Sequence, residues 1–280
     1  MAAKSVTYVG TGGAPDRAIT GVGFQPTFMM VGLGLQSCRG TNWTASRLHN
    51  VTVGADTAVL VSIDTDGFTV TLALNALGTT YYAVCFGGDN DVEAGEYTGD
   101  ATDNREITTT MDPEMVWVLH DDGAVATGLI HTVNMGVDVT MNFYGNLAAA
   151  GVADYIQTFG TGKFTVGATM NALNKKYGWV AFRASAAHVV GSYAGDGTNP
   201  RTFTVNTPAN IEYAFTKAYT SGAVGAASRV KDHISGQSVP HPNNVQAGAI
   251  LDFSTSESYT THASLRTNSA SHSYDRWTYS

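Results

Sequence analysis

The amino-acid sequence predicts an all-β protein made of three tandem β-sandwich repeats, Ig-like or jelly-roll-like and about 90 residues each. Two blocks of sequence recur along the chain at a common period, and internal repeats of this kind define the architecture. Only 14% of the residues are charged and 31 are glycine, whereas an average globular protein has about 25% charged residues. We place the repeats at residues 1–92, 93–189 and 190–280, the third being divergent.

The first recurring block joins a tyrosine to an arginine through a small polar turn. It reads YTGDATDNREI from Tyr97 and YAGDGTNPRTF from Tyr193, and the copy from Tyr8, YVGTGGAPDRAI, is one residue longer. The recurrent positions are Tyr8, Arg17, Tyr97, Arg105, Tyr193 and Arg201. A recurrent pair of this kind is a candidate glycan or partner contact. Because residues repeated in every unit more often build the fold, we expect the arginine to satisfy turn carbonyls beside the tyrosine ring.

The second block supplies the closing strands of each unit. Residues 67–86 read GFTVTLALNALGTTYYAVCF and residues 163–182 read KFTVGATMNALNKKYGWVAF, with a weaker version ending at Tyr279. The step from Phe68 to Asn75 equals the step from Phe164 to Asn171. Alternating apolar residues after Phe68 indicate a half-buried strand. Residues 75–78 are interpreted as the loop of a hairpin to the next strand, with a glycine that allows positive φ.

The middle of each unit begins with an apolar run. MVWVL at 115–119 predicts a strand buried on both faces, whereas the alternating IEYAF at 211–215 predicts one solvent-exposed face. Residues 147–159 and 224–234 are candidate short helices, although glycine and β-branched residues disfavour them. Six to eight short strands per unit, joined by Gly, Asn, Asp and Pro turns, are expected.

Charge, hydropathy and cysteine content bound the function. A net charge of −8 argues against a nucleic-acid partner, which requires a basic surface. No signal-peptide pattern and no run of about 20 apolar residues appears, so we expect no membrane span and synthesis in a host cytoplasm. Cys38 and Cys85 exclude a disulfide framework for the whole chain, and whether these two pair is left open.

Several stretches resemble chemical motifs, but each is incomplete. Residues 160–163 (GTGK) lack the rest of a phosphate-binding loop and are interpreted as a hairpin turn. The stretch 64–67 begins like a calcium loop but lacks the glutamate that such a loop requires, and the oxygen-rich stretch 89–96 is interpreted as a solvated acidic linker rather than a calcium site. His120, the two aspartates after it and His131 are interpreted as a polar strand end rather than a metal or acid–base site. We therefore expect no catalytic residue, cofactor site or metal site, and no enzyme.

The order Y-x-G-D-G-T-x-x-R, then P-x-x-V-W-V, then G-F-T-V…N…G…Y-x-A-x-x-F resembles repeat modules of tailed-bacteriophage virion proteins. The resemblance is carried by residues 97–105, 113–118, 163–182, 67–86 and 193–201. These modules occur in tail-fibre-like and other particle-surface chains, and the motif is a signature of the fold that brings no catalytic residue with it.

The resemblance implies a non-enzymatic structural protein on the exterior of a phage particle, either a capsid decoration or spike or a tail component. The implied partners are other virion proteins, with a homo-oligomer as a further expectation. One alternative is an adhesin that binds host-surface polysaccharide through exposed aromatic residues such as Trp43, Tyr144 or Trp277. A glycan-degrading enzyme is a third alternative, because two acids can always meet in a fold although no pair is selected here.

Overall fold

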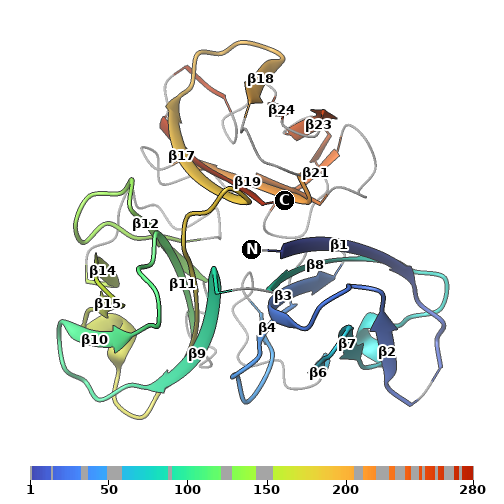
Figure 1. The fold of residues 1–280 in the computed structure, drawn as a ribbon, viewed down its shortest axis with the longest axis horizontal. Helices are drawn as coiled ribbons and strands as arrows, with labels where there is room; N and C mark the ends of the chain where they lie inside the picture. Colours follow the sequence, from blue (N-terminus) through green and yellow to red (C-terminus); the bar gives the residue numbers. More distant parts are fainter. Residues whose placement is uncertain are drawn as a thin grey trace.

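The computed structural model is all-β, with six antiparallel sheets arranged as three lobes (Figure 1). Among the residues that the structure describes, the regular elements are strands apart from two short 3-10 helices, η1 (Leu72–Leu74) and η2 (Ala168–Asn171). The structure describes residues 2–13, 15–32, 37–48, 59–87, 90–120, 128–142, 154–204, 211–218, 227–230, 237–240, 246–247, 250–255, 258–261, 268–270 and 273–279.

Lobe 1, which holds β1 to β8, has a five-stranded and a three-stranded sheet. The large sheet has the order β1-β8-β3-β4-β5 and the small sheet has the order β2-β7-β6. The strands are β1 (Ala2–Val9), β2 (Arg17–Thr20), β3 (Pro26–Gly32), β4 (Ser37–Gly40), β5 (Arg47–Leu48), β6 (Leu60–Asp64), β7 (Gly67–Val70) and β8 (Thr80–Gly87).

Lobe 2 holds β9 to β16 and has the corresponding strand orders. Its large sheet is β13-β12-β11-β16-β9 and its small sheet is β10-β15-β14. The strands are β9 (Val92–Thr98), β10 (Arg105–Thr108), β11 (Met115–His120), β12 (Leu129–Thr132), β13 (Met141–Asn142), β14 (Ile156–Gly160), β15 (Lys163–Val166) and β16 (Lys176–Phe182).

Lobe 3 holds β17 to β25 and adds one strand to the large sheet. The orders are β17-β25-β19-β20-β21-β22 and β18-β24-β23. The strands are β17 (His188–Ala194), β18 (Arg201–Thr204), β19 (Tyr213–Ala218), β20 (Ala227–Val230), β21 (Gln237–Pro240), β22 (Gln246–Ala247), β23 (Ile250–Thr255), β24 (Ser258–Thr261) and β25 (Ser273–Tyr279).

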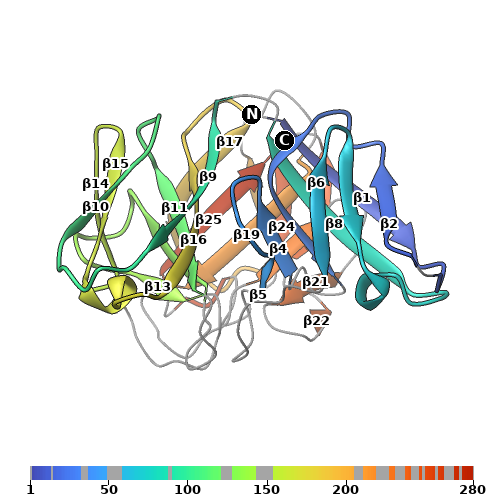
Figure 2. The ribbon, with the colours of Figure 1, turned by 90° about the horizontal axis from the view of Figure 1, so that it is seen from below.

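The large sheets face the middle of the molecule and the small sheets lie outside (Figure 1). Seen from the side, the lobes stand next to one another, and β1 begins and β25 ends near the centre (Figure 2). Each large sheet is therefore covered on both faces. In β11, Trp117 belongs to a cluster that contains residues of all three lobes, whereas its neighbour Val118 packs inside lobe 2.

The centre of the shared cluster consists of three aromatic rings, one from the last strand of each lobe. The ring centroids lie 5.7 Å apart for Phe86 and Phe182, 4.6 Å for Phe86 and Tyr279, and 5.4 Å for Phe182 and Tyr279. All three side chains are fully buried. We call these three residues the central aromatic triad. Aromatic pairs at such separations are stabilised beyond the area that they bury.

Two sequence-based predictions about strands are wrong. Strands β7 and β8 do not form a hairpin, because β7 pairs with β2 and β6 whereas β8 pairs with β1 and β3. The intervening segment crosses from the small sheet to the large one, and Gly78 has the expected positive φ of 74°. The run at 211–215 is buried on both faces, since Phe215 enters the shared cluster and Ala214 packs inside lobe 3.

Both candidate helices are contradicted where the structure describes them. Residues 156–160 form β14, and residues 227–230 form β20. The remaining parts of 147–159 and 224–234 lie outside the described residues, except 154–155, which form a bend. These segments are extended because their residues pair with a neighbouring strand. The helix propensity of a segment does not take such pairing into account.

Two other predictions are confirmed. The strand at 115–119 is fully buried, and residues 160–163 form the β14–β15 turn, with Gly160 paired to Lys163. The open question about the cysteines is also settled: Cys38 and Cys85 are free thiols. Cys38 lies in the shared cluster and Cys85 in the cluster of lobe 1, on opposite faces of one sheet. Burial raises the pKa of both thiols well above the usual range.

Candidate functional site

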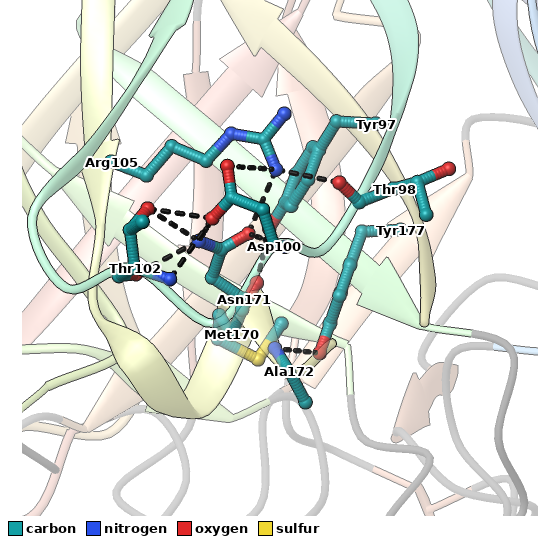
Figure 3. A network of polar contacts seen from close by, with 9 residues as sticks. All are labelled: Tyr97, Thr98, Asp100, Thr102, Arg105, Met170, Asn171, Ala172 and Tyr177. Atoms are coloured by element: carbon teal, nitrogen blue, oxygen red, sulfur yellow. Dashed lines mark hydrogen bonds and ion pairs between the residues drawn. The ribbon is translucent and has the colours of Figure 1, made fainter. Parts of the chain in front are cut away.

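The structure brings the recurrent tyrosine and arginine of each lobe into contact and adds an asparagine to them. In lobe 2, the Arg105 guanidinium carbon lies 5.2 Å from the centre of the Tyr97 ring. Its Nη1 donates to the Thr98 carbonyl at 2.6 Å and to the Asn171 Oδ1 at 2.9 Å (Figure 3). We call the set of Tyr97, Arg105 and Asn171, and its equivalents in the other lobes, the asparagine clamp.

The Asn171 amide forms hydrogen bonds through both of its ends, although its side chain is fully buried. Its Oδ1 also accepts from the Asp100 backbone nitrogen at 3.2 Å. Its Nδ2 donates to the Asp100 carboxylate and, at 2.8 Å, to the Thr102 carbonyl. Because both ends of the amide are paired, the clamp joins the β9–β10 turn to the last residue of η2. It thereby ties the two sheets of the lobe together.

The same clamp occurs in lobes 1 and 3. Arg17 Nη1 donates to the Val9 carbonyl at 2.6 Å and to Asn75 Oδ1 at 3.1 Å. Arg201 Nη1 donates to the Ala194 carbonyl at 2.7 Å and to the side-chain oxygen of Asn268 at 3.2 Å. The guanidinium carbons of Arg17 and Arg201 lie 5.5 Å and 5.2 Å from the centres of the Tyr8 and Tyr193 rings.

A second tyrosine stacks on the first in every lobe. Ring centroids are 5.3 Å apart for Tyr8 and Tyr81, 4.9 Å for Tyr97 and Tyr177, and 5.0 Å for Tyr193 and Tyr274. Burial raises the pKa of Tyr8, Tyr97 and Tyr193, and the neighbouring arginine opposes the rise only in part. These phenols therefore stay protonated and do not act as bases at neutral pH. The protonation state thus favours a structural role for the clamp.

The clamp in lobe 2 contains a conformational irregularity that mutagenesis can test. Ala101 has a φ of 66° where lobes 1 and 3 have Gly12 at 69° and Gly197 at 75°. Left-handed conformation costs a residue with a Cβ about 1–2 kcal/mol. We therefore expect Ala101→Gly to raise the free energy of unfolding by about 0.5–1 kcal/mol, after the entropy of glycine is subtracted. Urea denaturation measures the change.

The matched control is the reverse substitution in lobe 3. A Cβ on Gly197 would meet Ala270 Cβ at an ordinary 3.8 Å, so only the backbone conformation penalises it. Gly197→Ala is expected to destabilise the protein by about 1 kcal/mol. A decrease in the stability of the Ala101→Gly variant would contradict the assignment of a free-energy cost to the left-handed conformation of Ala101.

Two carboxylates that accept hydrogen bonds from the clamp asparagines, those of Asp100 and Asp196, predict that stability depends on pH in acid. Hydrogen bonds from Thr102 lower the pKa of Asp100 to about 2, and those from Thr198 act likewise on Asp196. An unfolded aspartate has a pKa of about 3.9. The stabilisation is therefore complete above about pH 4 and is lost as the pH falls towards about 2.

We expect Asp100→Asn with Asp196→Asn to flatten the stability profile in this acid window, measured by urea denaturation at several pH values. Lobe 1 has Thr11 at the corresponding position, where Asn75 Nδ2 donates to its Oγ1 at 3.2 Å. Thr11→Ser, which retains that hydroxyl, is the control and should leave the acid profile unchanged. An unaltered profile in the double variant would refute the assignment of the titration to these carboxylates.

A different set of contacts holds lobe 1 against lobe 2, and sequence reasoning missed it. Arg47 is fully buried and its Nη2 lies 2.7 Å from Glu96 Oε1. Its guanidinium carbon lies 4.8 Å from the centre of the Trp43 ring, and Trp43 donates to the Trp179 carbonyl at 3.2 Å. Arg47 and Trp43 occur in one lobe, so no repeat signal marks them. Between lobes 1 and 3, the Ser5 hydroxyl donates to Glu212 Oε2 at 2.6 Å.

Among the remaining sequence candidates, His131 is engaged within the protein. His131 is buried, its Nδ1 lies 2.6 Å from the Val139 carbonyl oxygen, and burial lowers its pKa. The side chain of His120 lies outside what the structure describes, as do Asp121 and Asp122. Among the described residues, no cluster of histidine, cysteine and acidic side chains is arranged to hold a metal ion.

The acidic stretches bind protein donors. Asp64 accepts from Ser62 and Thr69, and Asp66 accepts from the backbone of Gly21 and Gly23. In the stretch 89–96, Asp91, Glu93 and Glu96 accept hydrogen bonds from Arg183, Thr110 and Arg47, whereas residue 89 lies outside the described part.

The two tryptophans suggested for a glycan groove are buried. Trp43 is 2% exposed and Trp277 is fully buried, since both pack in the shared cluster. Tyr144 lies outside the described residues. The prediction was wrong for both tryptophans, because large aromatic side chains fill the space between the three large sheets.

Comparisons with known proteins found neither a matching family model nor a matching curated protein. In the described part of the chain, no helix is long and apolar enough to cross a membrane.

Proposed function

We propose that this chain is a non-enzymatic structural protein on the exterior of a tailed-bacteriophage particle. Its three tandem β-sandwich units, at residues 1–92, 93–189 and 190–280, imitate a trimer within one polypeptide. The observation that carries the proposal is the central aromatic triad, in which Phe86, Phe182 and Tyr279 meet with similar centroid separations. The resemblance of the repeated motifs to phage virion modules supports the kind of particle.

The strand pairing favours a jelly-roll-like unit over an Ig-like one. In lobe 1 the first strand pairs with the last, β1 with β8, and the second pairs with the last but one, β2 with β7. Lobes 2 and 3 have the same nested pairs. Nested antiparallel pairs of this kind are typical of eight-stranded jelly rolls, which are common in viral capsid proteins.

A structural role also fits how the repeated polar residues are used. In each asparagine clamp, the arginine binds a turn carbonyl and the asparagine of its own lobe. Groups that are paired inside the fold stabilise it and are not available to a substrate. Three similar outer surfaces around one axis would suit a position of threefold symmetry in a particle, where other virion proteins are the partners.

Immunogold labelling of intact particles with antibodies against the purified chain tests the proposal. Gold on the head or tail of the particle supports it and distinguishes a decoration from a tail component. Label confined to free protein in the lysate would contradict it. Binding of the purified chain on a glycan array, or loss of capsule polymer on incubation, would instead support the adhesin or the enzyme.

A further inference from the structure

The interior of lobe 3 is polar at five positions where the other two lobes are apolar. The register of β19 with β25 and of β18 with β24 places Thr216, Tyr259, Thr261, Arg276 and Thr278 on the faces that enclose this interior. The matching residues, in the same order, are Val31, Phe68, Val70, Ala83 and Cys85 in lobe 1, and Val118, Phe164, Val166, Trp179 and Ala181 in lobe 2.

Contacts across lobe 3 show that these residues face a common interior. Phe203 and Tyr259 of the small sheet pack in one cluster with Ala214 of the large sheet. The Arg276 guanidinium carbon lies 5.0 Å from the centre of the Phe203 ring. Burial raises the pKa of Tyr259 to about 12, and the positive charge of Arg276, together with its side-chain hydrogen bond to Tyr259, opposes that rise.

Four of the five side chains carry a buried polar atom without a hydrogen-bond partner in the protein. These atoms are the hydroxyls of Thr216, Thr261 and Thr278, and the Nε and Nη1 of Arg276, whereas the Tyr259 hydroxyl interacts with the Arg276 side chain. The four hydroxyl residues are fully buried. Nearly all buried polar groups in native proteins are paired, because an unpaired one loses its hydration without compensation. Four such side chains in one lobe, at positions that carry apolar residues in the other two lobes, indicate a binding role.

The charge at this place determines what would bind. No carboxylate among the described residues forms an ion pair with Arg276. The backbone makes room for its side chain, since a Cβ on Gly191 would lie 3.2 Å from Arg276 Nε. A guanidinium offers parallel donors that match the oxygens of a carboxylate or a phosphate, and hydroxyls complete the coordination of such a group.

We propose that lobe 3 binds a small oxyanion, with Arg276 as the charge partner and the hydroxyls of Thr216, Tyr259 and Thr261 as further donors. The ligand is a free phosphate or the carboxylate of a small organic acid, such as a sugar acid. This site is independent of the structural role proposed above, because it concerns one lobe and residues outside the asparagine clamp and the central aromatic triad.

Isothermal titration calorimetry of the full chain tests the site, with inorganic phosphate, acetate and glucuronate as probes. Sodium chloride at matched ionic strength is the control for screening. Saturable binding of at least one oxyanion with one site per chain is the expected result, and which probe binds distinguishes phosphate from carboxylate. The absence of binding by all three probes would overturn the proposal.

Two variants separate this site from a surface site. Arg276→Met retains an unbranched side chain that reaches about as far as the arginine Nε and removes the charge, and we expect it to weaken the binding by at least about tenfold. The triple variant Thr216→Val, Tyr259→Phe, Thr261→Val installs the residue types of lobes 1 and 2. It should fold with equal or higher melting temperature and lose the anion-dependent rise in melting temperature. Unchanged affinity in both variants would contradict the assignment.

Discussion

Replacing Arg47 with alanine is expected to lower the free energy of unfolding by about 3–5 kcal/mol, because it leaves a buried acceptor without its charge partner. The side chain of Arg47 is 1% exposed and that of its partner Glu96 is 16% exposed. Glu96 Oε1 also accepts from the Thr44 backbone nitrogen at 2.9 Å, so the pair belongs to a network that joins lobes 1 and 2. Urea denaturation followed by tryptophan fluorescence measures the loss.

The chain offers an exposed ion pair as the control. Lys163 binds Glu106 on the surface of lobe 2, where their side chains are 39% and 59% exposed. Lys163→Ala is expected to cost at most about 1 kcal/mol, since water screens such pairs. If Arg47→Ala were as mild as Lys163→Ala, the junction of lobes 1 and 2 would not depend on the buried pair.

Truncation of Phe182 to alanine in the central aromatic triad is expected to destabilise the protein by about 3–5 kcal/mol. The ring is fully buried and contacts both Phe86 and Tyr279, so its removal leaves a cavity that three lobes border. Such a cavity collapses poorly, because each wall is a separate sheet. Chemical denaturation of the full chain gives the change in unfolding free energy.

Phe164→Ala is the matched control for this variant. Phe164 is equally buried, but it packs in the cluster of lobe 2 alone. Both truncations should cost similar free energy, whereas only Phe182→Ala should lower the hydrogen-exchange protection of lobes 1 and 3. A loss of protection limited to lobe 2 in both variants would show that the triad does not couple the lobes.

The sequence predicted the strand-rich class because composition and repetition report on local structure. A tyrosine, an arginine and a later strand recur at nearly the same spacing in each repeat, and this signal identified the tyrosine and arginine of the clamp. The sequence also showed that Asn75 follows Phe68 at the same distance at which Asn171 follows Phe164. The meaning of this spacing was not visible, because the asparagine reaches a turn more than sixty residues away in the chain, and only the folded pairing of β1 with β8 brings the two together.

Contacts between lobes could not be predicted for a different reason. A repeat pattern describes what each copy does for itself, and the hydrophobic periodicity of a strand buried on both faces does not say which partner covers each face. The sizes of side chains that face each other on neighbouring strands could not be predicted either. Trp179 faces Gly95 in lobe 2 and Arg276 faces Gly191 in lobe 3, whereas Ala83 faces Val6 in lobe 1. Volume is balanced across strands, a relation that becomes visible once the register is known.

Native-state hydrogen exchange of the intact chain tests most directly whether the three lobes form one body around the central aromatic triad. The informative amides are those of Met30, Trp117 and Phe215, on the inner strands β3, β11 and β19. Because their side chains share one cluster, these amides should exchange with the same opening free energy and the same dependence on denaturant. Three distinct opening free energies, with one lobe exchanging while the others stay protected, would contradict the account.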